Sequence, residues 1–257
     1  MPVATLIPLR IAVTSDNICP FCFIGLRKLQ KALATSPYTS GPEAVFEPSI
    51  HFLPYQLDPT LPSDHALDKR ERYFNKFGPR FAQMEQMMQQ RGREEGIDFD
   101  YNGPLRSTFD SHRLMAYAYD KGGWEQQYKF IEVLFTHYFE KQGDPGCRVQ
   151  LSDLAVKSEL FASETSAKEW LASSALADEV KLGFERARSK GITGVPHFEL
   201  AAGEQDHLKA TAEVPGAQEA QCFRAVIERM AEKAGAVSKC PGDGCRTVSG
   251  AEARRCL

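Results

Sequence analysis

Apolar positions near the start of the chain follow a strand period, then a helical period, then a strand period again. Residues 9–15, LRIAVTS, are apolar and β-branched, which is typical of a buried strand. From Pro20 to about Ala34, apolar residues recur at helical spacing with Lys and Arg between them. A second strand is predicted around residues 45–55, where Pro48 indicates an edge strand or a break. This strand–helix–strand order predicts a parallel pair with a right-handed crossover.

The middle of the chain, about residues 60–188, has helical spacing throughout. Four segments show it, and each ends near a Gly or Pro: FAQMEQMMQQRGREEG, STFDSHRLMAYAYDKGG, WEQQYKFIEVLFTHYFEKQG and LSDLAVKSELF. No strand pattern separates them, so we expect four to six consecutive helices. The QMEQMM run is interpreted as helix packing rather than as a methionine binding surface.

Strand patterns return after residue 190. ITGVPHFELA follows a Gly-containing turn, residues 205–214 are its expected partner strand, and 216–235 are a final helix. We therefore predict an α/β fold whose sheet domain is discontinuous, with a large helical insertion between its two parts. The predicted domains are the sheet domain at 9–58 and 190–235, the helical subdomain at 60–188, and a flexible cysteine-containing tail at 236–257.

Composition narrows the classes of partner. The chain has 257 residues, 42% of them hydrophobic, and a net charge of -3, which gives no argument for nucleic acid or an anionic membrane. No apolar run approaches the roughly 20 residues of a membrane span, and the first residues lack the features of a secretory signal. We therefore expect a cytoplasmic protein. Its seven cysteines are an odd number, which argues for reduced thiols rather than a disulfide framework.

The sequence Cys-Pro-Phe-Cys stands where the first strand gives way to the first helix. Cys19 falls at the helix N-cap and Pro20 at the first helical position. Unpaired backbone N–H groups and the positive end of the helix dipole favour a thiolate at Cys19. Cys22 lies one turn further on and is expected to be more buried. This predicts a working dithiol in which Cys19 is the nucleophile and Cys22 resolves the mixed disulfide.

Two other interpretations of the cysteine pair are less favoured. A structural disulfide is unusual inside cells. A zinc half-site needs two more ligands, and no nearby second Cys pair or His pair supplies them. We therefore expect no metal.

Gly-Val-Pro-His-Phe, residues 194–198, is the second candidate element. A proline that opens a strand after a glycine turn can follow a cis peptide bond. Such a bend would bring the backbone of Val195 to Cys19, where it could pair with an extended substrate; the simpler interpretation is that Pro196 only initiates the strand. His197 would stabilise the Cys19 thiolate or act as a general acid. Since side chains alternate along a strand, it could equally point away.

Five motifs in order resemble the FrnE-like branch of the DsbA group of thioredoxin-like proteins. They are CPFCFIG, RFAQMEQMMQQRGREEGIDFDY, STFDSHRLMAYA, GVPHFEL and VPGAQ, and the resemblance extends from about residue 9 to 235. It implies a thioredoxin fold with a helical insertion and thiol–disulfide exchange on protein or small-molecule disulfides. The catalytic residues would be Cys19, Cys22 and Pro196, and the substrate-binding residues Pro20, Phe21, Val195, His197 and His112.

The resemblance implies no tightly bound cofactor, glutathione as a cosubstrate, and a homodimer. The sequence departs from the branch at Phe21, where a Trp is usual, and at His197, where an apolar residue is frequent. Val214-Pro215 also replaces a Ser-containing turn. The last two departures put substrate specificity in question more than fold.

Two alternatives stay open at this stage. Relatives include 2-hydroxychromene-2-carboxylate isomerases and kappa-class glutathione transferases, so the scaffold could serve an isomerase or tailoring enzyme for an aromatic or polyketide small molecule. Those relatives typically carry Ser or a lone residue where this chain has a Cys pair, which favours redox chemistry. A binding or chaperone-like module is the third hypothesis.

Two further features have a functional and a structural interpretation. His112 would face the cleft between insertion and sheet domain, or would be a hydrogen-bonded structural histidine there, and the structural interpretation is preferred. Cys240 and Cys245 in the tail form a Cys-x4-Cys pair. They would relay electrons to Cys19 and Cys22 as a second redox pair, or belong to an exposed loop.

Overall fold

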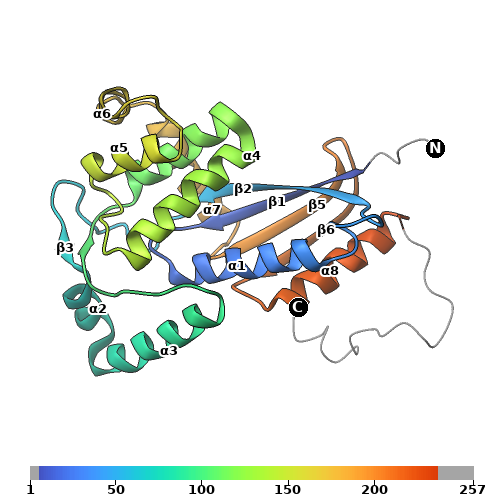
Figure 1. Ribbon diagram of the computed structural model, residues 1–257, viewed down its shortest axis with the longest axis horizontal. Coiled ribbons are helices and arrows are strands. Elements are labelled where there is room, and N and C mark those ends of the chain that lie inside the picture. Colours follow the sequence, from blue (N-terminus) through green and yellow to red (C-terminus); the bar gives the residue numbers. More distant parts are fainter. Residues whose placement is uncertain (1–5, 237–257) are drawn as a thin grey trace. The chain divides into compact units, whose positions relative to one another are not determined.

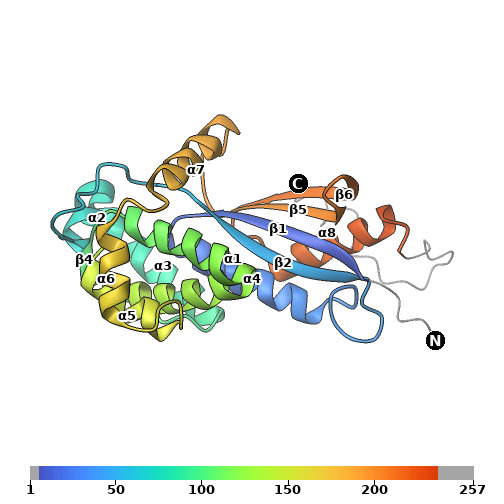
Figure 2. The ribbon, with the colours of Figure 1, turned by 90° about the horizontal axis from the view of Figure 1, so that it is seen from above.

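One four-stranded sheet contains the strands predicted at both ends of the chain. The computed structural model describes residues 6–236. The strands are β1 (Ile7–Ser15), β2 (Phe46–Pro54), β5 (His197–Glu204) and β6 (His207–Pro215), in the order β2-β1-β5-β6 (Figure 2). Backbone hydrogen bonds join Ile7 N to Val45 O and Tyr55 N to Ser15 O, so β1 and β2 are parallel, as predicted. Pro48 lies on an edge strand, where its missing N–H leaves no ladder bond unmade.

Helices α1 (Pro20–Thr35) and α8 (Ala220–Lys233) run along one face of this sheet (Figure 1). Phe198 of β5 and Phe223 of α8 are fully buried and meet edge-to-face, with ring centroids 4.9 Å apart. Strands β5 and β6 pair antiparallel. The order β-α-β, helical segment, β-β-α confirms the predicted α/β fold with its helical insertion.

The insertion contains six α-helices among the described residues. They are α2 (Lys69–Phe77), α3 (Phe81–Glu94), α4 (Phe109–Glu140), α5 (Arg148–Lys157), α6 (Glu164–Ala172) and α7 (Ala177–Ser189). A short 3-10 helix, η1 (Gly78–Arg80), joins α2 to α3, and two-residue strands β3 (Leu67–Asp68) and β4 (Pro104–Leu105) pair antiparallel. Sequence periodicity missed these two strands because they are too short to show alternation. Helix α4 bends at Gly122 and Gly123, between the two segments predicted as separate helices.

Contacts divide the chain into two compact units. Of the described residues, one unit comprises 6–13, 25–51 and 196–236, and the other comprises Thr14–Ile24 and Phe52–Val195. The predicted boundaries assign residues 14–24 to the sheet domain instead, and the predicted tail at 236–257 lies outside the described residues except for its first residue. Phe23 explains why the start of α1 belongs to the helical unit. Its ring centroid lies 5.0 to 6.4 Å from those of three rings of that unit, Phe99, Phe135 and Phe139.

Two buried polar side chains hold the helical unit together. Gln127 of α4 is fully buried; its Oε1 accepts from Phe52 N at 2.8 Å and its Nε2 donates to Phe52 O at 3.0 Å. The amide therefore substitutes for the missing neighbour strand at the outer edge of β2. Arg113 donates to Ala175 O and Ser173 O, and to the carboxylate of Asp110, at 2.7 to 2.8 Å. No helix within residues 6–236 has both the length and the apolar character needed to cross a bilayer.

Candidate active site

Cys19 immediately precedes α1, and Pro20 is the first residue of that helix. The turn that leads into it is closed by hydrogen bonds from Cys19 N to Asp16 O at 3.1 Å and from Cys22 N to Cys19 O at 3.0 Å. Pro20 costs no hydrogen bond in this position, because the first N–H groups of a helix have no partner within it. The cysteine pair therefore lies at the helix N-terminus, as the sequence predicts.

The two thiols lie in different environments. Cys19 is 4% exposed and lines a cavity, whereas Cys22 is 2% exposed and does not. Burial raises the pKa of Cys22 well above its ordinary value, and the neighbouring Cys19 raises it further. The Ser15 hydroxyl and the Asp16 backbone act in the opposite direction but do not offset burial. Cys22 is therefore a protonated thiol at neutral pH.

The segment before β5 reaches the first cysteine. The Cys19 thiol donates to Val195 O at 3.5 Å, so the backbone of Val195 approaches Cys19. Pro196 follows directly and lies against α1 at Gly25: a Cβ at Gly25 would stand 2.9 Å from Pro196 Cγ. The glycine of CPFCFIG is thus required by close packing. The isomer of the peptide bond before Pro196 stays a prediction.

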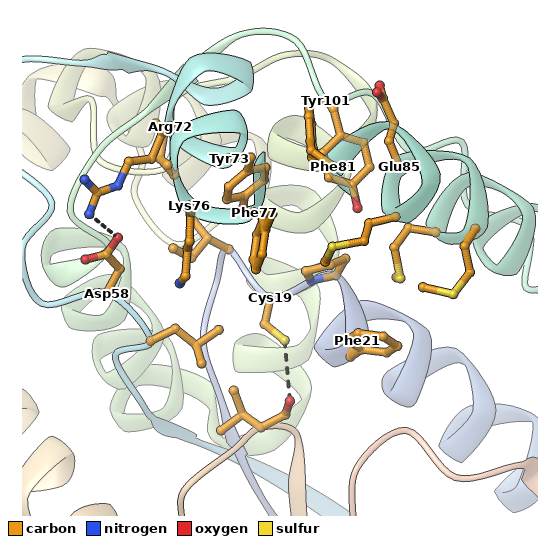
Figure 3. Close-up of a pocket in the computed structure, with 18 of the residues that line it drawn as sticks. Cys19, Phe21, Asp58, Arg72, Tyr73, Lys76, Phe77, Phe81, Glu85 and Tyr101 are labelled. Atoms are coloured by element: carbon orange, nitrogen blue, oxygen red, sulfur yellow. Dashed lines mark hydrogen bonds and ion pairs between the residues drawn. The ribbon is translucent and has the colours of Figure 1, made fainter. Parts of the chain in front are cut away.

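A cavity of about 330 Å³ opens beside Cys19 within the helical unit (Figure 3). Its wall comes from four places: residues 18–21 at the start of α1, Leu57 and Asp58 after β2, the facing sides of α2 and α3, and Gly194 with Val195. Such a volume is typical of a site for a small organic ligand. The cavity brings together segments that are far apart in the sequence, and Cys19 forms part of its wall.

Most of the cavity wall is apolar. Four rings form an aromatic wall, with neighbouring centroids 5.9 to 6.1 Å apart: Tyr73, Phe77, Phe81 and Tyr101. Burial raises the pKa of Tyr73 to about 12 and raises that of Tyr101 as well, so both phenols are neutral at physiological pH. Met84, Met87 and Met88 of α3 complete this side.

Charged groups gather on the side opposite Glu85, where Asp58, Arg72 and Lys76 lie together (Figure 3). Arg72 forms an ion pair with Asp58 at 2.7 Å. Burial opposes ionisation of Asp58, but hydrogen bonds from Thr60 and Arg72 outweigh it, so the pKa of Asp58 is below its usual value. Lys76 has no carboxylate partner among the described residues, so this edge of the cavity carries a net positive charge.

Three of the predicted substrate-binding residues line the cavity, and two do not. Pro20, Phe21 and Val195 are in its wall. His197 is not among its lining residues; its Nε2 lies 3.8 Å from Glu213 Oε2 on β6. The His197 side chain therefore lies beside Glu213 of the neighbouring strand β6.

His112 is fully buried in α4 and also lies outside the cavity wall. Its Nε2 is 3.5 Å from Asp16 Oδ1, its ring stands edge-on to Phe184, and neither ring nitrogen has a hydrogen-bond partner in the described part of the chain. The preferred interpretation expected a hydrogen-bonded histidine. The burial is present, but the hydrogen bonds are not.

Sequence reasoning missed the residues of α2 and α3 that complete the site. The QMEQMM run was interpreted as helix packing, yet three of its methionines line the cavity, and Met87 is 41% exposed. Met88 is buried at the same time, because a methionine at helical spacing can face a cavity as readily as a core. The signal in the sequence of α2 was the presence of Tyr73, Phe74 and Phe77 in a strongly basic segment, KRERYFNKF.

The tail pair Cys240 and Cys245 lies outside the described residues. Within residues 6–236, no group of three or more His, Cys, Asp or Glu side chains is placed to hold a metal ion.

Three solved structures resemble the chain closely in fold. A probable DsbA oxidoreductase from Streptomyces coelicolor is 25% identical, with a TM-score of 0.70 over 91% of this chain and 94% of that one. A 2-hydroxychromene-2-carboxylate isomerase is 15% identical, with a TM-score of 0.57 over 89% and 100%. The cytosolic disulfide reductase DsbM from Pseudomonas aeruginosa, solved with GSH, is 13% identical, with a TM-score of 0.53 over 87% and 99%. The last two likenesses show the fold alone.

No curated protein matches the chain significantly in sequence. Residues 10–228 match the family model of the DSBA-like thioredoxin domain, a range that includes the cysteine pair, Val195 and the whole cavity wall. The chain therefore belongs to the DSBA-like thioredoxin family.

Proposed function

We propose that the protein is a thiol–disulfide oxidoreductase in which Cys19 is the nucleophile and Cys22 the resolving cysteine. One observation carries the proposal: two free cysteines stand at the start of α1, the first on the wall of a cavity and the second buried behind it. A substrate that enters the cavity therefore meets only Cys19. A metal site or a structural disulfide would not require this asymmetry.

The chemistry has two exchange steps. The Cys19 thiolate attacks one sulfur of a substrate disulfide, forms a mixed disulfide and releases the other sulfur as a thiolate. Cys22 then loses its proton and attacks the Cys19 sulfur, which forms the Cys19–Cys22 disulfide and releases the second substrate thiolate. The substrate gains two electrons and the cysteine pair loses two. Two equivalents of a low-molecular-weight thiol, for which we propose glutathione, restore the dithiol.

The geometry assigns different tasks to the residues around the sulfur. The carbonyl of Val195, 3.5 Å from Cys19 Sγ, accepts from the thiol in the resting state. An incoming disulfide displaces that contact and leaves the Val195 backbone free to pair with the substrate. Pro196, packed on α1 at Gly25, holds this segment in place. The burial of Cys22 delays resolution until its proton is removed.

A redox titration tests the proposal. The protein is equilibrated in glutathione buffers of varied potential, thiols are trapped by alkylation, and the peptide carrying Cys19 and Cys22 is weighed. We expect a reversible two-electron transition at a potential roughly between -120 and -270 mV. Cys22→Ser is expected to accumulate a glutathione mixed disulfide at Cys19. Cys147→Ser is the matched control, since Cys147 is a free, half-buried cysteine outside the cavity wall. A pair that stays reduced across the whole series would exclude the proposed activity.

The apolar cavity favours one second candidate, an isomerase or tailoring enzyme for an aromatic small molecule. That chemistry uses Cys19, or a thiol bound beside it, without oxidation of the pair. Turnover of such a substrate would survive Cys22→Ser, whereas disulfide turnover would not. The same variant therefore separates the two functions.

A further inference from the structure

We propose that the cavity selects low-molecular-weight disulfides with an apolar body and a negatively charged group, in preference to polar peptide disulfides. This inference rests on the proposed function, because it names the substrate class for exchange at Cys19. The features that carry it are the access to the sulfur, the apolar wall and the charge at one edge.

Access to Cys19 limits the size of its substrates. The residue is 4% exposed, and the small exposed part belongs to the cavity wall. A disulfide must therefore enter the cavity before the sulfur atoms can meet in line. About 330 Å³ accommodates a compact organic molecule. A disulfide held in the surface of a folded protein cannot reach the same depth without bringing its backbone into an apolar wall that offers few hydrogen-bond partners.

The apolar cavity wall determines which kind of ligand body fits against it. The aromatic wall defined above lines the cavity together with Met84, Met87 and Met88, so a ligand would lie among rings and polarizable thioethers. Three apolar residues of the cavity wall are also exposed for large hydrophobic side chains: Leu57 by 41%, Phe77 by 37% and Met87 by 41%. Exposed apolar surface gathered in one place is typical of a binding site. An aryl or alkyl group would cover this surface, whereas glutathione would cover less of it and should therefore react at Cys19 more slowly.

The positive charge at the edge of the cavity determines the sign of the charge that a ligand should carry. Of the ionisable residues in the wall, Arg72 is paired with Asp58, and Glu85 is paired with Arg70 at 2.6 Å. Lys76 has no such partner within residues 6–236, and it stands at the polar edge beside Asp58 and Arg72 (Figure 3). An anionic group on the ligand would pair with Lys76 while the apolar body lies on the aromatic wall. The exchange itself is the balanced two-step reaction given above.

Three disulfides test the selection. Dithiobis(nitrobenzoate) is aromatic and anionic, dithiodipyridine is aromatic and uncharged, and oxidised glutathione is anionic but has a polar body, so it tests the apolar wall at a matched sign of charge. The rate of modification of the Cys19 peptide is followed by mass spectrometry, since other cysteines react too. Each rate is divided by the rate of the same disulfide with N-acetylcysteine, which removes differences in intrinsic reactivity. We expect the normalised rate to fall in the order given, with oxidised glutathione at least tenfold slower than dithiobis(nitrobenzoate).

Two variants isolate the charge. Lys76→Gln is expected to lower the normalised rate for dithiobis(nitrobenzoate) by about two- to fivefold, the range of a partly exposed ion pair, and to leave dithiodipyridine unchanged. Met87→Glu places a negative charge at the exposed rim and is expected to act in the same direction. The matched control is Lys181→Gln, because Lys181 is exposed on α7, pairs with Asp178 and does not line the cavity.

Two results would overturn the inference and leave the proposed function intact. One is equal normalised rates for all three disulfides. The other is an effect of Lys76→Gln that is the same for the charged and the uncharged aromatic disulfide. Failure of Cys19 to react with any of the three would instead overturn the proposed function.

Discussion

Replacement of Gln127 by Leu should destabilise the protein without changing the accessibility of Cys19 in the native state. The Gln127 amide satisfies both the N–H and the C=O of Phe52 on the outer edge of β2, at 2.8 and 3.0 Å, and it is fully buried. Leucine has a similar volume but neither a donor nor an acceptor. The variant therefore leaves two buried backbone groups without a partner, because β2 is an edge strand of the sheet that residues 6–236 form.

The magnitude follows from those two groups. Each unsatisfied buried backbone group costs about 1–3 kcal/mol, and the extra apolar burial of leucine returns about 1–2 kcal/mol. The middle of this range is a net loss of about 2–3 kcal/mol in the free energy of unfolding. For a chain of this length that corresponds to a fall in Tm of roughly 4–10 °C.

Urea unfolding followed by far-UV circular dichroism measures the loss, and the rate of Cys19 alkylation in native buffer measures the site. Gln126→Leu is the matched control on the same helix. Gln126 is half-buried and donates to Ser158 O at 2.8 Å, so its loss should cost under about 1 kcal/mol. If Gln127→Leu and Gln126→Leu unfold at the same urea concentration, the edge of β2 does not depend on the Gln127 amide.

Three further predictions concern buried ionisable groups. Because burial raises the pKa of Cys22, the mixed disulfide at Cys19 should resolve faster as pH rises, by about tenfold per pH unit up to that pKa. Stopped-flow measurement of the second exchange step checks this, and a rate that does not change with pH would contradict it. Burial lowers the pKa of Lys69 to about 8 in the folded state, below its value in the unfolded chain. Above pH 8 the unfolded chain therefore binds more protons than the folded one, and folding becomes more favourable as pH rises. The free energy of unfolding of wild type should gain about 2 kcal/mol relative to Lys69→Met between pH 8 and 9.5. An equal pH dependence of the two proteins in urea titrations would refute that assignment. Arg113→Met removes a buried cation from the carboxylate of Asp110 and from three carbonyls, although Asp110 keeps its ion pair with Arg148. Calorimetry should therefore show a loss of about 2–4 kcal/mol, and a loss below about 1 kcal/mol would show that the network adds little.

The parts of the fold that were predictable are those set by short-range periodicity. The strands at 9–15 and 45–55 and the helix from Pro20 were each found to within a few residues, because alternation and helical spacing are local properties of the chain. The edge position of β2 followed from Pro48 for the same reason. The strands β3 and β4 were not predicted, since a two-residue strand forms only where a partner segment is brought to it.

The sequence by itself determined the reactive element. The spacing of Cys19 and Cys22, with Pro20 at the first helical position, requires only one turn of helix, so it can be inferred without knowledge of the rest of the fold. The tertiary structure decided the rest of the site: that α2 and α3 supply the cavity wall, that Lys76 is left without a carboxylate partner within residues 6–236, and that His112 packs beside Asp16 rather than in the cavity. Helical periodicity shows which side chains share a face of a helix. Which element that face meets depends on long-range packing, and the same apolar pattern serves a core and a cavity equally well.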